Sequence, residues 1–247
     1  MSCGSTVGLP AALLSGRVEA MPIFQPLDWI ALAVFVASWL AYGWLVDFSP
    51  WRERTLTAAM NRQRRLWMEM LARRDLRIID TSIIAGLQNG TAFYASTSLL
   101  AIGAAFAVLT TSDQVMTAVQ QLPLPLNTSR SEWEAKAIGL LAIYAYAFFK
   151  FGWSYRLFNY TSILIGAVPF AAERESEASQ SAVERAVHMN VLAGHHFSLG
   201  QRAFFFSVGF LGWFASAWLF LAVTLIVMLA LARRQFAFPN LALLDGG

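Results

Sequence analysis

Long apolar stretches separated by charged connections dominate the sequence. Four of them reach the length of about 20 mostly apolar residues that a helix needs to cross a membrane, at about residues 27–46, 80–109, 135–160 and 203–232. The fourth stretch is apolar on every face of a helix between Arg202 and Arg233, which disfavours the alternative of a soluble bundle with buried helices. We therefore predict an all-α, polytopic membrane protein with four transmembrane helices and cytoplasmic helical extensions.

Composition agrees with this fold class. Hydrophobic residues make up 57% of the 247 residues and charged residues only 13%, against about 25% charged in a soluble domain. No segment of domain length lacks an apolar stretch, so we predict one membrane domain over residues 21–235 and a tail at 236–247. Residues 1–20 have no basic signal region, and Met21 directly precedes the first stretch. We expect an unstructured N-terminal extension there, with Met21 as a possible true start.

Basic residues predict the orientation, because Lys and Arg concentrate in cytoplasmic connections. No Lys or Arg occurs between Met21 and Trp51, whereas the connection at residues 51–77 carries eight arginines. With four spans, both termini are then expected outside. Arg233 and Arg234, close to the C-terminus, argue mildly against this arrangement.

The first connection, residues 51–77, has no Pro or Gly and shows apolar residues at helical spacing. Beside a membrane span, its basic side chains are expected to contact anionic lipid headgroups rather than nucleic acid. The third connection, residues 171–201, also has a helical pattern and contains four glutamates. The two helices could pack together as a cytoplasmic extension, or each could lie separately in water or on lipid. The eight arginines are Arg52, Arg54, Arg62, Arg64, Arg65, Arg73, Arg74 and Arg77.

Polar residues inside the apolar stretches are costly and therefore candidates for function. Lys150 could bind an anion or a lipid headgroup in a cavity. Alternatively, its amine could reach the membrane interface along an apolar stem, or it could form a fixed pair with Asp80. The whole candidate membrane cluster consists of Asp80, Gln88, Asn89, Lys150, Arg156 and Asn159.

No established catalytic or metal-binding pattern occurs in the sequence. Cys3 is the only cysteine, which excludes thiolate metal clusters. His188, His195 and His196 are the only histidines, and they lack the further ligands of a confident metal site. No phosphate-binding loop, serine nucleophile motif or zinc-protease motif is present. We therefore predict no catalytic residue, no cofactor and no metal.

Several blocks resemble a known family. They are RRLWME at residues 64–69, FFKFGWSYR at 148–156, NYTSILIGA at 159–167 and HFSLGQRA at 196–203. Together they are similar to the integral membrane proteins called "domain of unknown function 599", and the likeness extends from the first span to the fourth. The resemblance implies a multi-pass protein of the bacterial inner (cell) membrane. The family has no established activity, so the resemblance implies no catalytic residue.

Three classes of function remain open at this point. A non-enzymatic membrane scaffold, assembly or regulatory component, with a homo-oligomer or a membrane-protein partner, is favoured by the basic connection and the lack of a catalytic grouping. A small channel or transporter would use the polar groups around Lys150. A lipid-modifying enzyme at the inner interface would need acidic and histidine groups to converge, for example Asp80 with His195 or His196.

Overall fold

A computed structural model of the protein describes residues 24–111, 114, 117 and 129–237. In this part of the chain helices joined by short connections are the regular secondary structure, without a β-strand. The predicted N-terminal extension and most of the predicted tail lie outside the described residues. Short 3-10 turns occur at Arg52–Arg54, Ala171–Glu173 and Gly212–Phe214. The helices are α1 (Pro26–Asp47), α2 (Leu56–Leu71), α3 (Ile78–Thr110), α5 (Arg130–Gly166), α6 (Glu177–Leu211) and α7 (Ala217–Phe236).

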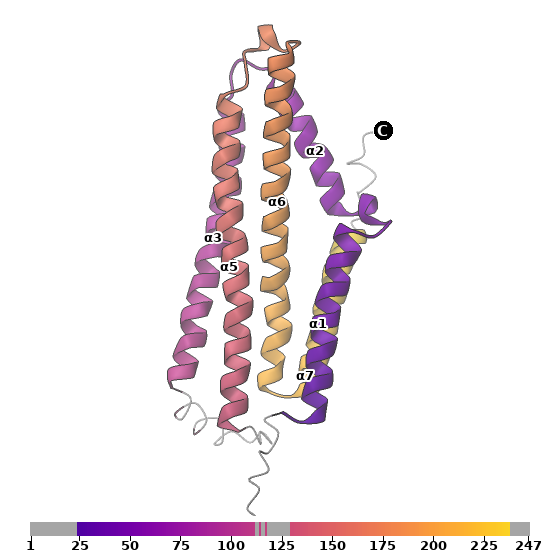
Figure 1. The fold of residues 1–247 in the computed structure, drawn as a ribbon, viewed down its shortest axis with the longest axis vertical. Helices are drawn as coiled ribbons and strands as arrows, with labels where there is room; N and C mark the ends of the chain where they lie inside the picture. Colours follow the sequence, from indigo (N-terminus) through magenta and orange to yellow (C-terminus); the bar gives the residue numbers. More distant parts are fainter. Residues whose placement is uncertain (1–23, 112–113, 115–116, 118–128, 238–247) are drawn as a thin grey trace, which may run out of the picture.

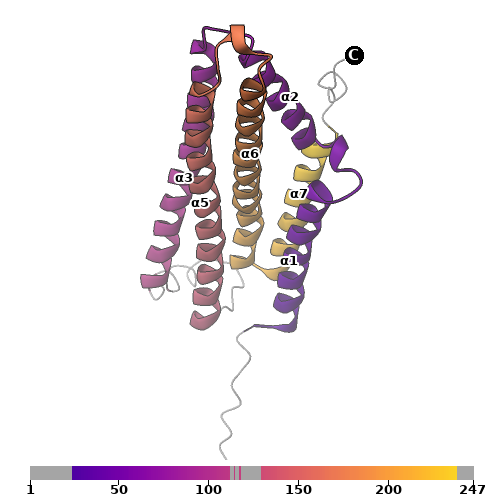
Figure 2. The same ribbon diagram turned by 45° about the horizontal axis from the view of Figure 1, so that its top comes forward.

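The three longest helices run side by side, and two shorter ones cover only one end of them. In Figures 1 and 2, α5 runs antiparallel to both α3 and α6, while α1 and α7 pack together beside the lower part of α6. Helix α2 crosses obliquely from the upper end of α1 to the start of α3. The all-α prediction is therefore confirmed.

Helix lengths divide the fold into two levels. Helices α1 and α7 have 22 and 20 residues, or about 30 Å at 1.5 Å per residue, which matches the hydrocarbon thickness of a bilayer. Helices α3, α5 and α6 have 33, 37 and 35 residues, or roughly 50–55 Å. They therefore extend about 20 Å past the level of α1 and α7. We call this upper part, together with α2, the extension.

Within the described residues, four helices are long and apolar enough to span a membrane, as predicted, but the fourth has different bounds. It is Ala217–Phe236, and the predicted continuous helix over residues 203–232 is wrong. The chain turns back at Gly212–Phe214, so that the end of α6 and the start of α7 are antiparallel. At Ser216 the hydroxyl accepts a hydrogen bond from the Leu219 amide (3.1 Å) and begins α7.

Small residues permit this tight return. A Cβ atom on Gly212 would lie 3.1 Å from the Leu219 carbonyl oxygen, and one on Gly209 would lie 3.0 Å from the Thr224 hydroxyl. Both arms of the turn are apolar and no charge or proline separates them. The hydropathy pattern therefore predicts one continuous apolar segment where the structure has the end of α6 and the start of α7.

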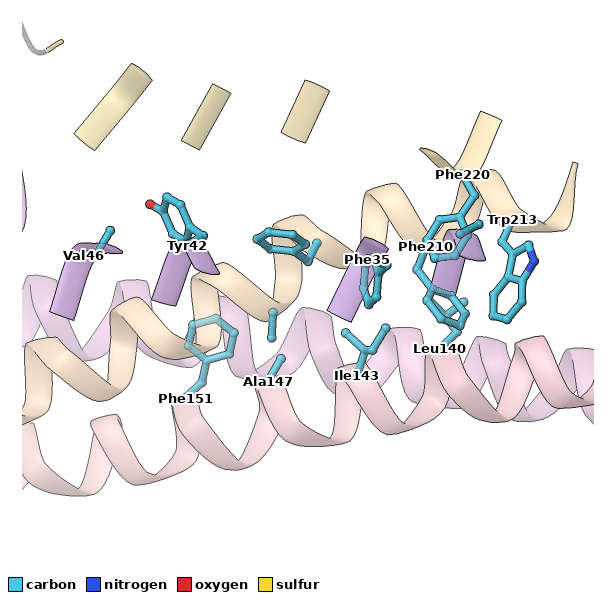
Figure 3. Packing of buried hydrophobic residues seen from close by; sticks show 13 residues of the cluster. Phe35, Tyr42, Val46, Leu140, Ile143, Ala147, Phe151, Phe210, Trp213 and Phe220 are labelled. Atoms are coloured by element: carbon cyan, nitrogen blue, oxygen red, sulfur yellow. The ribbon is translucent and has the colours of Figure 1, made fainter. Parts of the chain in front are cut away.

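Each level has its own packed core. At the level of α1 and α7, aromatic side chains from four helices belong to one buried cluster. Figure 3 shows Phe35, Phe151, Phe210, Trp213 and Phe220 of this cluster. In the extension, side chains of α2, α3, α5 and α6 form a second cluster of buried apolar residues. The second cluster fixes α2 against α6 just beyond the end of the first core.

Candidate anion-binding cavity

The six residues of the predicted membrane cluster do not form one site. The Gln88 amide donates to the Asn159 side-chain oxygen (2.6 Å) and joins α3 to α5. Asp80 is fully buried elsewhere, where it accepts hydrogen bonds from the Trp67 indole (2.7 Å) and from Arg74 (3.2 Å). These contacts tie α2 to α3.

The other three members of that cluster make different contacts or are exposed. Lys150 places its amine 5.3 Å from the centre of the Tyr146 ring on the same helix. The exposed Arg156 donates to the Tyr160 hydroxyl (2.6 Å), one turn further along α5. Asn89 is exposed on α3.

Three arginines of the first connection bind groups within the extension. Arg77 donates to three backbone carbonyls in the last turn of α5 and just after it, at 2.6–3.0 Å. Arg74 reaches Asp80, as described above. Arg65 forms two hydrogen bonds with Glu184 of α6 (2.7 and 2.9 Å), and this contact lowers the pKa of the Glu184 carboxyl. The packing of the basic helix against the acidic one is thus confirmed.

The remaining arginines lie toward solvent, with one exception. Arg52 pairs with Glu53 at 3.1 Å, and Arg62 lies 4.0 Å from the same carboxylate. Arg54 and Arg73 are exposed. Arg64 is the exception, because its guanidinium points inward between α2 and α6.

Arg64 lies at a cavity of about 160 Å³ between the end of α1, the start of α2, the middle of α6 and the end of α7. We call it the arginine cavity. Among the described residues that line it, three are arginines and none is a carboxylate. The residues are Tyr42, Leu56, Thr57, Met60, Asn61, Arg64, Gly194, Phe197, Ser198, Gln201, Arg202, Phe205, Leu231, Arg234 and Gln235.

Arg64 is held by neutral groups. It donates to the backbone carbonyl (3.4 Å) and the side-chain oxygen of Asn190, and it lies 5.9 Å from the centre of the Phe158 ring. A Cβ atom on Gly194 would lie 3.0 Å from the guanidinium carbon, so glycine makes room for the Arg64 side chain. Burial lowers the pKa of the Arg64 guanidinium, because removal from water disfavours the charged form.

The other two arginines differ in how their charge is balanced. Arg202 is buried and forms two hydrogen bonds with Asp47 of α1, at 2.5 and 2.8 Å. Arg234 is exposed in the last turn of α7 and has no ion-pair partner within the described residues. Because Asp47 balances Arg202, two positive charges at the cavity, those of Arg64 and Arg234, lack a carboxylate.

A hydrogen bond also connects two walls of the cavity. The Gln235 amide of α7 bonds to the Thr57 hydroxyl of α2. Helix α2 therefore reaches α7 at one end of the cavity and α6, through Arg64, at another. An anion held between Arg64 and Arg234 would bridge the same elements.

The sequence identified Arg64 only as one of the eight arginines of the first connection, and it did not predict the residues that share the cavity with Arg64. From the sequence, Arg202 only marks the start of the fourth span, and Arg234 is only one of a pair of arginines that argues mildly against an outside C-terminus. The antiparallel return of α7 brings Arg234 back to the level of α2, beside Arg202 of α6. One feature of the sequence pointed to this arrangement. Arg233 and Arg234 follow a span whose end was expected outside, whereas arginines usually concentrate on the cytoplasmic side.

No group of three potential metal ligands occurs within the part of the chain that the structure describes. The rings of His195 and His196 lie 5.9 Å apart, and His196 contacts Trp153. Glu184, the carboxylate one turn before His188, is engaged by Arg65.

Comparison with known proteins adds the family but no activity. Searches against curated proteins and against solved structures find no match. One family model matches residues 30–240, from α1 to just past the end of α7. The chain belongs to the family described as "Protein of unknown function, DUF599".

Proposed function

We propose that this protein is a non-enzymatic membrane component that binds an anionic group in the arginine cavity, in an assembly or regulatory role. The observation that carries the proposal is the composition of the wall around about 160 Å³, where Asp47 balances Arg202 but Arg64 and Arg234 have no carboxylate among the described residues. Like charges that gather without a counter-charge are unfavourable. A bound anion would relieve this cost.

The chemistry of the wall supports binding rather than catalysis. Its polar side chains are guanidinium, amide and hydroxyl groups. An arginine stays protonated at all ordinary pH values, so it can hold an anion but cannot exchange a proton with a substrate near neutral pH. General acid–base catalysis would require a group whose pKa lies near the working pH.

The channel or transporter and the lipid-modifying enzyme were each suggested by polar residues that have other contacts in the structure. The polar residues expected around a channel at Lys150 are distributed over separate contacts on α3 and α5. Asp80, the acid proposed for an enzyme, is buried against Trp67 and Arg74. No contact in the described chain favours either alternative over anion binding.

The same geometry supports a new membrane topology. Because α6 passes the level of α1 and α7 before the chain turns back, the chain would cross the membrane five times, by α1, α3, α5, the end of α6 and α7. The N-terminus would lie outside and the C-terminus in the cytoplasm. This arrangement replaces our expectation of two outside termini, and it puts Arg233 and Arg234 on the same side as the arginines of α2, in agreement with the positive-inside rule.

Single-cysteine labelling tests the topology in a Cys3→Ser background. Ser216 lies in the turn between α6 and α7, and Arg233 lies in the last turn of α7. We expect Ser216→Cys to react with a membrane-impermeant maleimide in intact cells, and Arg233→Cys to react only after permeabilisation. Labelling of Arg233→Cys in intact cells would contradict five crossings.

Thermal unfolding in nanodiscs of neutral lipid tests anion binding, because a ligand that binds only the folded state raises the melting midpoint. Inorganic phosphate and anionic lipids are added in separate series at constant ionic strength. We expect at least one of them to raise the midpoint of the wild type and of Arg233→Gln, but not of Arg64→Gln or Arg234→Gln. Arg233 is the matched control because it neighbours Arg234 and does not line the cavity. Equal rises in all four proteins, or no rise in any, would contradict the proposed function.

A further inference from the structure

We infer that the ligand of the arginine cavity is a membrane lipid with a phosphate monoester headgroup. Its phosphate would lie between Arg64 and Arg234, and its acyl chains would leave past Phe205 and Leu231 into the cytoplasmic leaflet. This inference rests on the proposed function and adds the class of ligand.

The position of the cavity favours a lipid. It lies where α1 ends at Asp47, where α2 begins at Leu56, and beside the last turn of α7. With the bilayer at the level of α1 and α7, this is the interface at which lipid phosphates lie. A lipid could therefore enter sideways from its own leaflet without leaving the membrane.

The wall of the cavity is itself amphipathic. It presents the polar groups of Arg64 on α2 and Arg234 on α7, and also the half-buried apolar side chains of Phe205 on α6 and Leu231 on α7. Leu231 continues the apolar part of α7, a helix long and apolar enough to cross a membrane. A ligand with one anionic end and one apolar end can contact both kinds of side chain, whereas a free inorganic anion contacts only the polar ones.

The charge balance favours a dianion over a monoanion. Asp47 already neutralises Arg202, and Arg64 and Arg234 have no carboxylate partner in the described chain. A phosphate monoester carries a charge of about −1.5 to −2 at neutral pH, because its second pKa is about 6. A phosphodiester has no second ionisable group and carries about half of that charge. Guanidinium groups also bind phosphate oxygens through two parallel hydrogen bonds.

The size of the cavity restricts the headgroup. A volume of about 160 Å³ corresponds to roughly five water molecules at about 30 Å³ each. A phosphate group fits this space, while a phosphate that carries a sugar or a second glycerol must extend beyond it.

Native mass spectrometry of lipid binding tests the inference. The purified protein is placed in phosphatidylcholine nanodiscs that contain either phosphatidic acid, a monoester, or phosphatidylglycerol, a diester of comparable chain length. We expect the wild type to retain phosphatidic acid at least about tenfold better than phosphatidylglycerol. Loss of one charge-assisted hydrogen-bonding partner should weaken that binding about tenfold to a hundredfold in Arg64→Gln and in Arg234→Gln.

Two further variants locate the site. Arg233→Gln should bind as the wild type does, because its side chain lies outside the cavity wall. Gly194→Ala should weaken binding without a change of charge, because the added Cβ displaces the Arg64 guanidinium. Melting midpoints in pure phosphatidylcholine nanodiscs show whether each variant is folded, and a folded Gly194→Ala with wild-type binding would count against the assigned site.

The outcomes separate the inference from the proposed function. Equal retention of the two lipids, or equal loss in Arg233→Gln and Arg234→Gln, would overturn the monoester lipid and indicate general attraction to a charged surface. If inorganic phosphate raises the melting midpoint through Arg64 and Arg234 while no lipid is retained, the cavity is a site for a free anion. In that case this inference fails and the proposed function stands. If neither ligand binds, both fail.

Discussion

The ion pair between Arg202 and Asp47 connects α6 to α1 at the edge of the membrane level, and its removal gives a sharp prediction. The side chains are only 6% and 14% exposed, and the Arg202 guanidinium also lies 5.5 Å from the centre of the Tyr42 ring. Asp47→Asn leaves this guanidinium buried without a negative partner. Removal of one partner of a buried pair costs about 3–5 kcal/mol, chiefly because the other charge stays buried.

Thermal unfolding of the detergent-solubilised protein, followed by tryptophan fluorescence, measures this effect. For a chain of this size, 1 kcal/mol corresponds to roughly 2–4 °C in the melting midpoint, so we expect Asp47→Asn to lower the midpoint by roughly 6–20 °C. The matched control is Glu53→Gln. It removes a carboxylate that is 68% exposed and pairs with Arg52, and an exposed pair contributes at most about 1 kcal/mol.

A double substitution separates the buried charge from other effects of the change. In Asp47→Asn with Arg202→Met the uncompensated charge is gone, so we expect part of the lost stability to return. The reasoning would be refuted if Asp47→Asn were no less stable than Glu53→Gln. It would also be refuted if the double variant were less stable than Asp47→Asn, since the buried charge would then not be the cause.

Three further predictions concern packing, capping and surface charge. Gly200→Ala should lower the free energy of unfolding by about 1–3 kcal/mol, measured by thermal unfolding, because the added Cβ would lie 2.7 Å from the buried Phe151 ring. Adding Phe151→Leu to this variant should restore part of the lost stability. Arg77→Met should increase amide hydrogen exchange at the end of α5, where Arg77 binds three backbone carbonyls; unchanged exchange would mean that these bonds do not hold the helix end. Glu184→Gln should lower the free energy of unfolding by less than about 1 kcal/mol, because the ion pair of Glu184 with Arg65 is half-exposed. Arg65 lowers the pKa of the Glu184 carboxyl. The stability that this pair contributes is therefore present above the carboxyl's unfolded pKa and is lost as the pH falls through its folded pKa. Urea unfolding measured from neutral to acid pH should show that the wild type loses its advantage in stability over Glu184→Gln.

The sequence alone predicted those helices that polar residues bound on both sides. The first span was expected at about residues 27–46 and is Pro26–Asp47, and the second was expected at about 80–109 and is Ile78–Thr110. Pro26 and Asp47 mark the ends of the first by their own chemistry. The turn at Gly212–Phe214 has no such marker, because tertiary packing against the start of α7 stabilises it rather than a polar or proline signal.

The cavity was less predictable than the fold for the same reason. Arg64 could be recognised as one of a set of interfacial arginines, but its inward orientation depends on the space that Gly194 leaves on a helix more than a hundred residues away. Arg234 reaches the same place only because α7 returns toward α2. Sequence pattern identifies charged residues near a membrane, and only the arrangement of helices shows which of them face one another.

An experimental structure of the protein in nanodiscs that contain phosphatidic acid would test the central claim most directly. We predict density for a phosphate group in contact with the guanidinium groups of Arg64 and Arg234, continuous with an acyl chain beside Phe205 and Leu231. A well-ordered cavity that contains no such density would contradict the account, as would an Arg234 that pairs with a carboxylate of the protein instead.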